Sequence, residues 1–379
     1  MKKHILPVFL MILFVAAPAG LTAESLRIAA ITDMSGPHHL IQKPVLETIQ
    51  LAVQQINKNA PETGFSIELL EIDSKGTVLG SRIAAKKAVK KEVSAVLGPL
   101  RSSASRSAAS VLQAAGVVMI TPTATNPSVT LQGEYIFRTC YTDTFQGKVL
   151  AEFAASTINA KTAGVLINAK NRYSTGLAES FILNFARMGG TIVYQADYLE
   201  NVTDLDKMVR KVEPEKPDVI FIPGYSRDAG TIIKKIREHR IDSVLIGGDG
   251  WGTAPIGTYA GDAVDGAFRT SFWHPDLPDP KSRAFVEKFN KSHGKIKRYD
   301  IATAYEAVMV LAKAARNAPS ADPADIRDSL NNINDFEGIT GRMRFNENGD
   351  PIKSTVMLKY QKRQPIFYKT VSHETLLKK

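Results

Sequence analysis

A chain of 379 residues with 44% hydrophobic residues is long enough for about two globular domains, each with its own core. The single cysteine, Cys140, excludes an intramolecular disulfide, and we expect its side chain to be a small buried filler. The net charge of +10 does not predict a nucleic-acid partner. The basic clusters at 86–91 and 234–235 have helical spacing among apolar residues, as the solvated faces of helices do.

The N-terminus has the pattern of a secretory signal peptide. Basic residues at 2–4 precede an apolar stretch at 5–17 and then small residues that end at Ala23. The apolar stretch is shorter than the roughly 20 residues of a membrane-spanning helix, so a transmembrane anchor is the weaker interpretation. We predict cleavage after Ala23 and a periplasmic protein. No cysteine lies near the cleavage site, so we expect no lipid anchor.

From residue 24 onward, short apolar strands alternate with helical patterns. The first run has predicted strands and helices at 26–32, 44–57, 65–72, 81–91, 93–97, 103–115 and 117–120. The pattern then restarts, with helices and strands at 144–158, 163–168, 174–188, 191–196, 204–212, 218–222, 227–239 and 244–246. Such alternation is typical of parallel sheets covered by helices on both faces.

After residue 268 the alternation of strands and helices ends. The sequence predicts three helices, at 280–292, 301–316 and 323–331, and then strands between 341 and 368. Neither late segment buries its apolar face alone, so we expect the helices to join the first unit and the strands the second. The predicted fold is α/β, with two doubly wound parallel-sheet lobes joined by a three-stranded hinge. The predicted division is a signal peptide at 1–23, a first lobe at 24–141 and 273–336, and a second lobe at 142–272 and 337–379.

Polar loops follow two predicted strands of the first unit, where ligands bind in open parallel sheets. A Gly-Pro turn at 98–99 leads to Arg101, Ser102 and Ser103 at the start of a helix. Free N–H groups and the helix dipole favour an anion there, although N-capping is an ordinary role for such serines. The next loop holds Thr123 and Thr125 between two prolines, which restrict its backbone.

The second unit places Tyr173, Tyr225 and Asp249 after three of its predicted strands. Each has an ordinary explanation by itself, as a packed aromatic residue or a turn residue. Their coincidence with the two polar loops of the first unit predicts one ligand cleft between two lobes.

Patterns typical of enzymes are missing from the sequence. There is no dinucleotide fingerprint, no phosphate-binding Gly-Lys-Ser/Thr loop and no Gly-x-Ser-x-Gly turn, and the His residues lack metal-ligand spacing. We therefore expect a non-catalytic binder without metal or cofactor.

The motifs in their order resemble the periplasmic leucine/isoleucine/valine-binding protein family, the type I receptors of branched-chain amino-acid ABC importers. The resemblance covers residues from 24 to about 379. No single motif is specific, but their order and spacing along nearly the whole chain are. They are Met34-Ser35-Gly36-Pro37, Gly98-Pro99-Leu100 with Ser102-Ser103, Thr123 to Pro127, Tyr173 with Gly176, Gly224-Tyr225, Gly247 to Gly250, and Gly261-Asp262 with Val264-Asp265-Gly266.

The resemblance implies a monomeric receptor that holds an amino acid by its zwitterionic end and passes it to a membrane permease. By this resemblance, Ser102 and Thr125 would bind the carboxylate. The Thr123 carbonyl, the Thr125 hydroxyl and the Asp249 carboxylate would bind the ammonium group, and Tyr173 and Tyr225 would close over the ligand. A sensor that reports to a membrane receptor, or a binder of an aromatic acid or an amide, remains an alternative.

Two positions depart from the pattern of that family. Ile41 and Gln42 stand where an aromatic residue and a glycine are common, in a loop that often touches the ligand side chain. Arg101 occupies a position expected to line the pocket, where it would either meet a second carboxylate or point into solvent. The departures leave the identity of the ligand side chain open.

Overall fold

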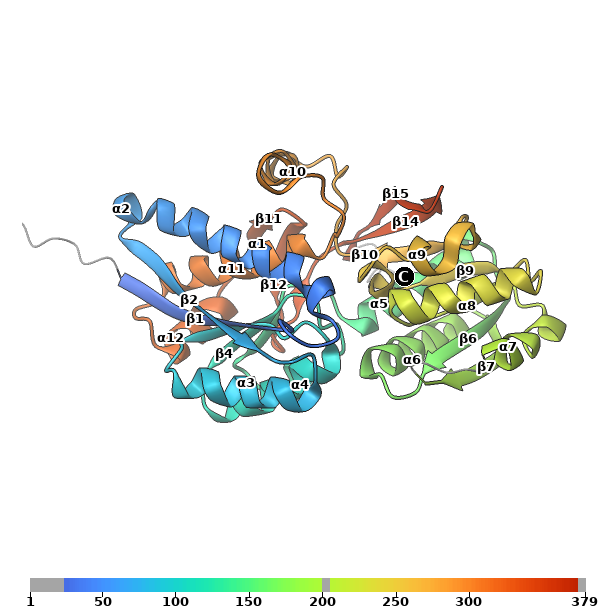
Figure 1. The fold of residues 1–379 in the computed structure, drawn as a ribbon, viewed down its shortest axis with the longest axis horizontal. Helices are drawn as coiled ribbons and strands as arrows, with labels where there is room; N and C mark the ends of the chain where they lie inside the picture. The colour runs from blue at the N-terminus through green and yellow to red at the C-terminus, as the bar shows by residue number, and fades with distance from the viewer. Residues whose placement is uncertain (1–23, 200–204, 374–379) are drawn as a thin grey trace, which may run out of the picture.

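The computed structural model describes residues 24–199 and 205–373 and shows two α/β lobes side by side (Figure 1). The predicted signal peptide at 1–23 lies outside the described residues. Within the described ranges, no helix is long and apolar enough to cross a membrane.

The first lobe contains a parallel five-stranded sheet in the order β2-β1-β3-β4-β5. Its strands are β1 (Glu24–Thr32), β2 (Phe65–Asp73), β3 (Ala95–Leu97), β4 (Val118–Thr121) and β5 (Ile136–Arg138). Helices α1 (His39–Lys58) and α11 (Ile301–Asn317) pack on one face, and α3 (Val78–Lys90) and α4 (Ser102–Ala114) pack on the other.

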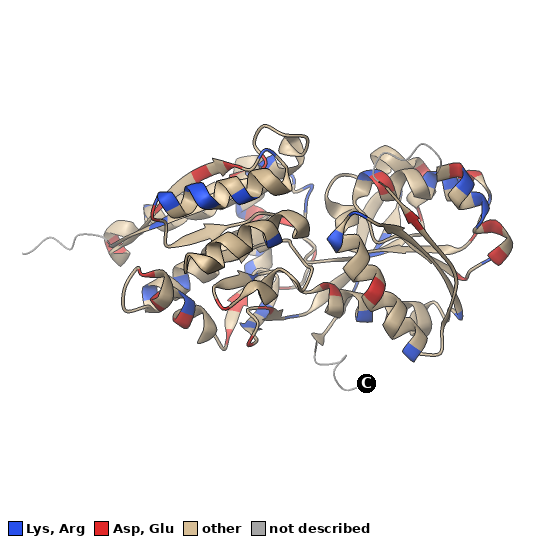
Figure 2. Ribbon diagram, turned by 90° about the horizontal axis from the view of Figure 1, so that it is seen from below, with Lys and Arg blue, Asp and Glu red and all other residues tan. Residues whose placement is uncertain are grey.

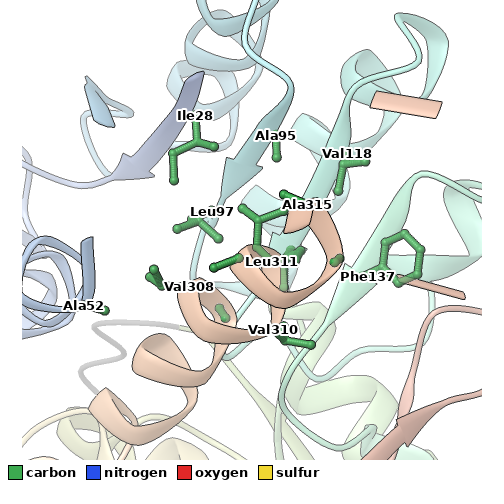
Figure 3. Close-up of a cluster of buried hydrophobic side chains, with 14 of the residues drawn as sticks. Ile28, Ala52, Ala95, Leu97, Val118, Phe137, Val308, Val310, Leu311 and Ala315 are labelled. Atoms are coloured by element: carbon green, nitrogen blue, oxygen red, sulfur yellow. The ribbon is translucent and has the colours of Figure 1, made fainter. Parts of the chain in front are cut away.

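The core of this lobe joins segments that are far apart in the sequence. Figure 3 shows side chains of α11, including Val308 and Leu311, against Ile28 and Leu97 of the sheet. Helix α11 is buried on most sides, so it functions as a central element of the lobe rather than a surface helix. Helix α12 (Pro323–Asn331) adds Ile326 and Leu330 to the same core, while α2 (Ala60–Thr63) is a short turn after α1.

The second lobe contains a seven-stranded sheet in the order β15-β14-β10-β9-β8-β6-β7. Strands β6 (Thr162–Asn168), β7 (Thr191–Tyr198), β8 (Val219–Phe221), β9 (Val244–Gly247) and β10 (Phe268–Ser271) are parallel. At one edge, β14 (Thr355–Gln361) is antiparallel to β10, and β15 (Gln364–Val371) is antiparallel to β14. One face carries α5 (Asp143–Glu152) and α6 (Arg172–Arg187), and the other carries α7 (Leu205–Arg210), α8 (Ser226–Glu238) and α9 (Gly257–Ala260).

A small antiparallel sheet differs from the predicted division of the chain. It comprises β11 (Phe336–Gly338), β12 (Gly341–Phe345) and β13 (Pro351–Ile352). We expected the strands after residue 337 in the second lobe, but Met343 and Phe345 are buried in the core of the first. The reason is an edge-to-face contact between Phe345 and Phe137 of β5, with ring centroids 5.3 Å apart. Only β14 and β15 of the tail join the second lobe.

The chain crosses between the lobes after β5, after β10 and after β13, which gives the three-stranded hinge. Lys353 in the last crossing donates to the Thr139 carbonyl of the first at 3.1 Å. Where the other two crossings meet the second sheet, Thr355 at the start of β14 donates to the Ser271 carbonyl at the end of β10 at 3.0 Å. Lys353 also forms an ion pair of 3.0 Å with Glu306 of α11, and both side chains are 1% exposed. Helix α10 (Pro280–His293) covers two of the crossings through an aromatic cluster.

Charged side chains of both signs occur on the helices of both lobes (Figure 2). The basic clusters lie on solvated faces, with Lys86, Lys87 and Lys90 exposed on α3 and Lys234 exposed on α8. Cys140 is buried in the hinge region, and burial raises the pKa of its thiol, so it is not an activated nucleophile.

Candidate ligand-binding cleft

A cavity of about 430 Å³ lies between the two lobes, and residues from both lobes form its walls. Most of the predicted site residues meet there. Ile41, Arg101, Ser102 and Thr123 line it from the first lobe, and Tyr173, Tyr225 and Asp249 line it from the second.

The Gly-Pro turn after β3 places the start of α4 at the cavity. Gly98 has a φ of +90°, and a Cβ there would lie 2.5 Å from the Ile31 carbonyl oxygen, so the turn requires glycine. The Pro99 carbonyl accepts hydrogen bonds from the hydroxyls of Ser105 at 2.7 Å and Thr121 at 2.6 Å. These bonds fix the turn against α4 and β4, and thereby the helix N-terminus.

The first turn of α4 points a polar end toward the cavity. Arg101 occupies the N-cap position but makes no side-chain cap bond, so the helix N-terminus keeps donor capacity for an anion. The Ser102 hydroxyl accepts from the Asn126 N–H at 3.3 Å, and the Thr123 hydroxyl donates to the Leu100 carbonyl at 2.7 Å. The two polar loops of the first lobe are thus joined to each other.

Ser103 and Thr125 are not among the described residues that line the cavity. Ser103 is half-buried on the next position of α4. Thr125 is 1% exposed, and its carbonyl accepts from the Asp143 N–H at 2.8 Å. Its hydroxyl acts on the neighbouring Asp143 carboxyl, whose pKa it lowers against the raising effect of burial. Thr125 therefore lies outside the lining of the cavity, next to the buried Asp143.

Asp249 is a half-buried residue whose carboxylate lies on the second-lobe side of the cavity. It begins a short 3₁₀ turn, Asp249–Gly252, directly after β9. Burial raises its pKa to about 6, while hydrogen bonds from Gln146 and Tyr173 and the charge of Arg269 act in the opposite direction. At neutral pH the carboxylate is therefore mostly ionised and disposed to take up a cationic group.

Tyr173, Tyr225 and Arg101 form a stack that bridges the lobes. The rings of Tyr173 and Tyr225 have centroids 5.2 Å apart and nearly parallel planes, and the Tyr173 hydroxyl accepts from the Gly250 N–H at 2.9 Å. The Arg101 guanidinium lies 4.1 Å above the Tyr225 ring, and its Nη1 is 2.5 Å from His38 Nε2. Arg101 thus lines the cavity and contacts the opposite lobe.

Several cavity residues were missed by sequence reasoning, among them Arg269, Arg298, Tyr299 and Asp300. Arg298 and Asp300 form an ion pair, and Arg298 also donates to the Thr253 carbonyl across the cleft. The segment 298–300, between α10 and α11, contains no recognisable motif. Its residues are brought to the cleft by tertiary packing alone. The one sequence signal for Arg269 is a charged residue inside the short strand β10.

Metal ligands do not gather within the described ranges, where no group of three or more His, Cys, Asp or Glu side chains is placed to hold an ion. The arrangement is instead a helix N-terminus, a half-buried carboxylate and two aromatic rings around one cavity. These features suit the binding of a small zwitterion.

Comparison with known proteins gives the family. Residues 25–364 match the family described as periplasmic binding protein. The chain belongs to this family. Its relatives include a leucine-, isoleucine-, valine-, threonine- and alanine-binding protein of Pseudomonas aeruginosa, 28% identical over 88% of this chain and 89% of that protein. Another is a leucine-specific-binding protein of Salmonella typhimurium, 26% identical over 92% of this chain and 94% of that protein.

Solved structures show the same architecture. A leucine-binding protein of Thermotoga maritima has a TM-score of 0.87 and 29% identity, covering 92% of this chain and 99% of its own. A branched-chain amino-acid binding protein of Streptococcus pneumoniae, solved with isoleucine, has a TM-score of 0.84 and 27% identity, covering 92% and 99%. The chain is thus a type I periplasmic binding protein, a substrate-binding protein and not an enzyme.

Proposed function

We propose that this protein is exported to the periplasm without a lipid anchor, captures an amino acid as a monomer and delivers it to the permease of an ABC importer. The observation that carries the proposal is the half-buried Asp249 carboxylate, which shares one cavity with the N-terminus of α4. The named ligands of the relatives, which are amino acids, support it.

The ligand carboxylate would bind at the first turn of α4. The free N–H groups there and the Ser102 hydroxyl offer donors to an anion. The Thr125 hydroxyl of the adjoining loop, which acts on the Asp143 carboxyl in this structure, would be a further donor. A small rearrangement of that loop would bring it into contact with the ligand.

The ligand ammonium would bind at Asp249. A buried ammonium requires a charged or multiply accepting partner, because its desolvation is otherwise too unfavourable. Asp249 supplies the charge, and the Thr123 carbonyl and Thr125 hydroxyl would supply further acceptors. The raised pKa of Asp249 falls again when a cation binds beside it, so ligand and carboxylate stabilise each other.

Closure of the lobes would complete the site. The ligand would contact α4 on one lobe and Asp249, Tyr173 and Tyr225 on the other, so it would bind the closed state more tightly than the open one. The three crossings of the hinge, tied by Lys353 and Thr355, would allow the lobes to rotate while remaining in register.

A thermal-shift screen of the purified protein against L-amino acids and small organic acids tests this proposal. A ligand that binds only the folded state raises the melting temperature, and we expect at least one L-amino acid to do so. If no amino acid raised the melting temperature while an organic acid without an amino group did, the amino-acid assignment would be wrong.

A further inference from the structure

Arg269 is a buried cation in the cavity wall that the zwitterion-binding groups do not use. It lies in the middle of β10, paired in register with Gly247 of β9 and Leu358 of β14. The residue is only 3% exposed, yet it lines the cavity. A charged side chain in the centre of a sheet is unfavourable unless charged or polar groups compensate it.

The surroundings of Arg269 hold the guanidinium in a fixed place. Its Nε donates to the Tyr360 hydroxyl at 3.0 Å, and its Nη1 donates to the Thr270 carbonyl at 3.0 Å. The guanidinium packs flat on Gly252, where an added Cβ would lie 2.9 Å from Nη1. The Tyr299 ring is 5.8 Å from the guanidinium carbon. These contacts therefore hold the Arg269 guanidinium in a fixed position at the cavity wall.

No carboxylate in 24–199 or 205–373 forms an ion pair with Arg269, and its hydrogen bonds go to neutral oxygens. Arg298, another cavity arginine, differs, because Asp300 pairs with it. Asp249 is close enough for the charges to influence each other but does not contact Arg269. A buried guanidinium that faces a cavity and has only neutral partners is suited to an anionic group of the ligand.

Arg269 and Asp249, the proposed ammonium site, lie near each other in the wall of the same cavity. Gly247, the last residue of β9, pairs with Arg269, and Asp249 follows two residues later in the turn after that strand. Adjacent strands are about 4.8 Å apart and each residue advances about 3.3 Å. The two side chains therefore start less than about 10 Å apart on one wall. The cavity of about 430 Å³ leaves room for an extended side chain between them.

We propose that Arg269 binds a side-chain carboxylate, so that the preferred ligand is an acidic amino acid such as L-glutamate or L-aspartate. This inference rests on the proposed function, in which the amino-acid end of the ligand occupies the α4 N-terminus and Asp249. With the acidic ligand bound, the α-carboxylate, the ammonium group and the side-chain carboxylate each face a complementary group of the protein.

Isothermal titration of the wild type with L-glutamate, L-glutamine and L-leucine tests the inference. We expect L-glutamate to bind at least tenfold more tightly than L-glutamine. In Arg269→Met the affinity for L-glutamate should fall at least ~30-fold, as for loss of one partner of a buried charge pair, while that for L-glutamine changes by only a few-fold. Gly252→Ala keeps the charge of Arg269 but displaces its guanidinium, so this variant should also reduce the preference for L-glutamate over L-glutamine. Arg187→Met, which removes an exposed arginine outside the cavity, is the control and should bind like the wild type.

Each other result has a defined meaning. If L-leucine bound as tightly as L-glutamate, or if Arg269→Met weakened all three ligands equally, the inference would be overturned while the amino-acid function stood. If Arg269→Met did not fold, unchanged ligand preference in Gly252→Ala would overturn it. If none of these three ligands bound while another L-amino acid did, the inference would be overturned and the amino-acid function would stand; if no L-amino acid bound the wild type, the proposed function itself would be overturned.

Discussion

Gln146 holds Asp249 at both its backbone and its carboxylate. The Gln146 Nε2 donates to Asp249 Oδ1 at 2.8 Å, and the Gln146 Oε1 accepts from the Asp249 N–H at 2.8 Å. The same Oε1 accepts from the Thr270 hydroxyl at 2.6 Å. Gln146 is fully buried on α5. Its side-chain amide therefore joins three elements beneath the cavity, namely α5, strand β10 and the turn that follows β9.

Replacement of this amide tests whether Asp249 is positioned by it. In Gln146→Leu, Asp249 loses the hydrogen bond that lowers its pKa, so the pKa should rise above about 6. Amino-acid affinity at pH 7 should fall, and it should recover partly at pH 8 to 9, where the carboxylate ionises again. Titration calorimetry across pH measures this, with exposed Gln195→Leu as the control. An affinity loss with no pH dependence would mean that Gln146 supports packing only.

The raised pKa of Asp249 makes the stability of the ligand-free protein depend on pH. The pKa is about 6 in the folded protein and 3.8 in the unfolded chain, so the folded state binds the proton more tightly. The stabilising contribution of the protonated group is complete below about pH 4 and is lost as the pH rises through about 6. The difference corresponds to at most about 3 kcal/mol.

Asp249→Asn removes this titration. At pH 8 we expect the ligand-free variant to be more stable than the wild type by about 1 to 3 kcal/mol, with the gain shrinking toward pH 4. Urea unfolding at both pH values gives the two free energies of unfolding, and exposed Asp242→Asn should show no such difference. A gain of the same size at pH 4 and pH 8 would contradict the role of Asp249 ionisation.

The fold was largely predictable because apolar periodicity records which faces are buried. Strand β1 and helix α8 begin and end within a few residues of the predicted ranges. Short strands were missed: β5 and β11 have three residues each, too few for an alternating pattern. Helix α1 begins before Pro44, whereas we began the predicted helix at that proline.

The cleft was predictable where a residue follows a strand. Tyr173, Tyr225 and Asp249 were found because strand ends of a parallel sheet meet at one edge. Arg298 was not, because it reaches the cleft only after α10 and the second crossing return the chain to the first lobe. We predicted the third crossing between residues 336 and 337, but it follows β13. The contact between Phe345 and Phe137 keeps this part of the tail in the first lobe, and no local sequence pattern predicts that contact.

The buried Lys353–Glu306 pair should stabilise the hinge. In Lys353→Met, Glu306 loses its cation and remains almost fully buried, which should lower the free energy of unfolding by about 3 to 5 kcal/mol. In the double variant with Glu306→Gln, most of this loss should be recovered. Urea unfolding measures both, with exposed Lys86→Met as the control. Equal destabilisation in the single and double variants would show that the uncompensated charge is not the cause.

Ligand binding should close the lobes. A saturating amino acid contacts α4 on one lobe and Asp249 on the other, so small-angle scattering should show a smaller radius of gyration with ligand than without. In Tyr225→Ala the stack with Tyr173 and Arg101 is lost, so the same compaction should require more ligand. An unchanged radius of gyration on saturation of the wild type would argue against a closing cleft.

The most direct test of an amino-acid site between the lobes is titration calorimetry of the wild type and Asp249→Ala with the amino acid that gives the largest thermal shift. We predict one site per chain in the wild type and a loss of affinity of at least ~30-fold in Asp249→Ala, because the ligand ammonium would be buried without its counter-charge. Asp242→Ala, which removes an exposed carboxylate, should bind like the wild type. Unchanged affinity in a folded Asp249→Ala would contradict the placement of the ammonium group and the site built around it.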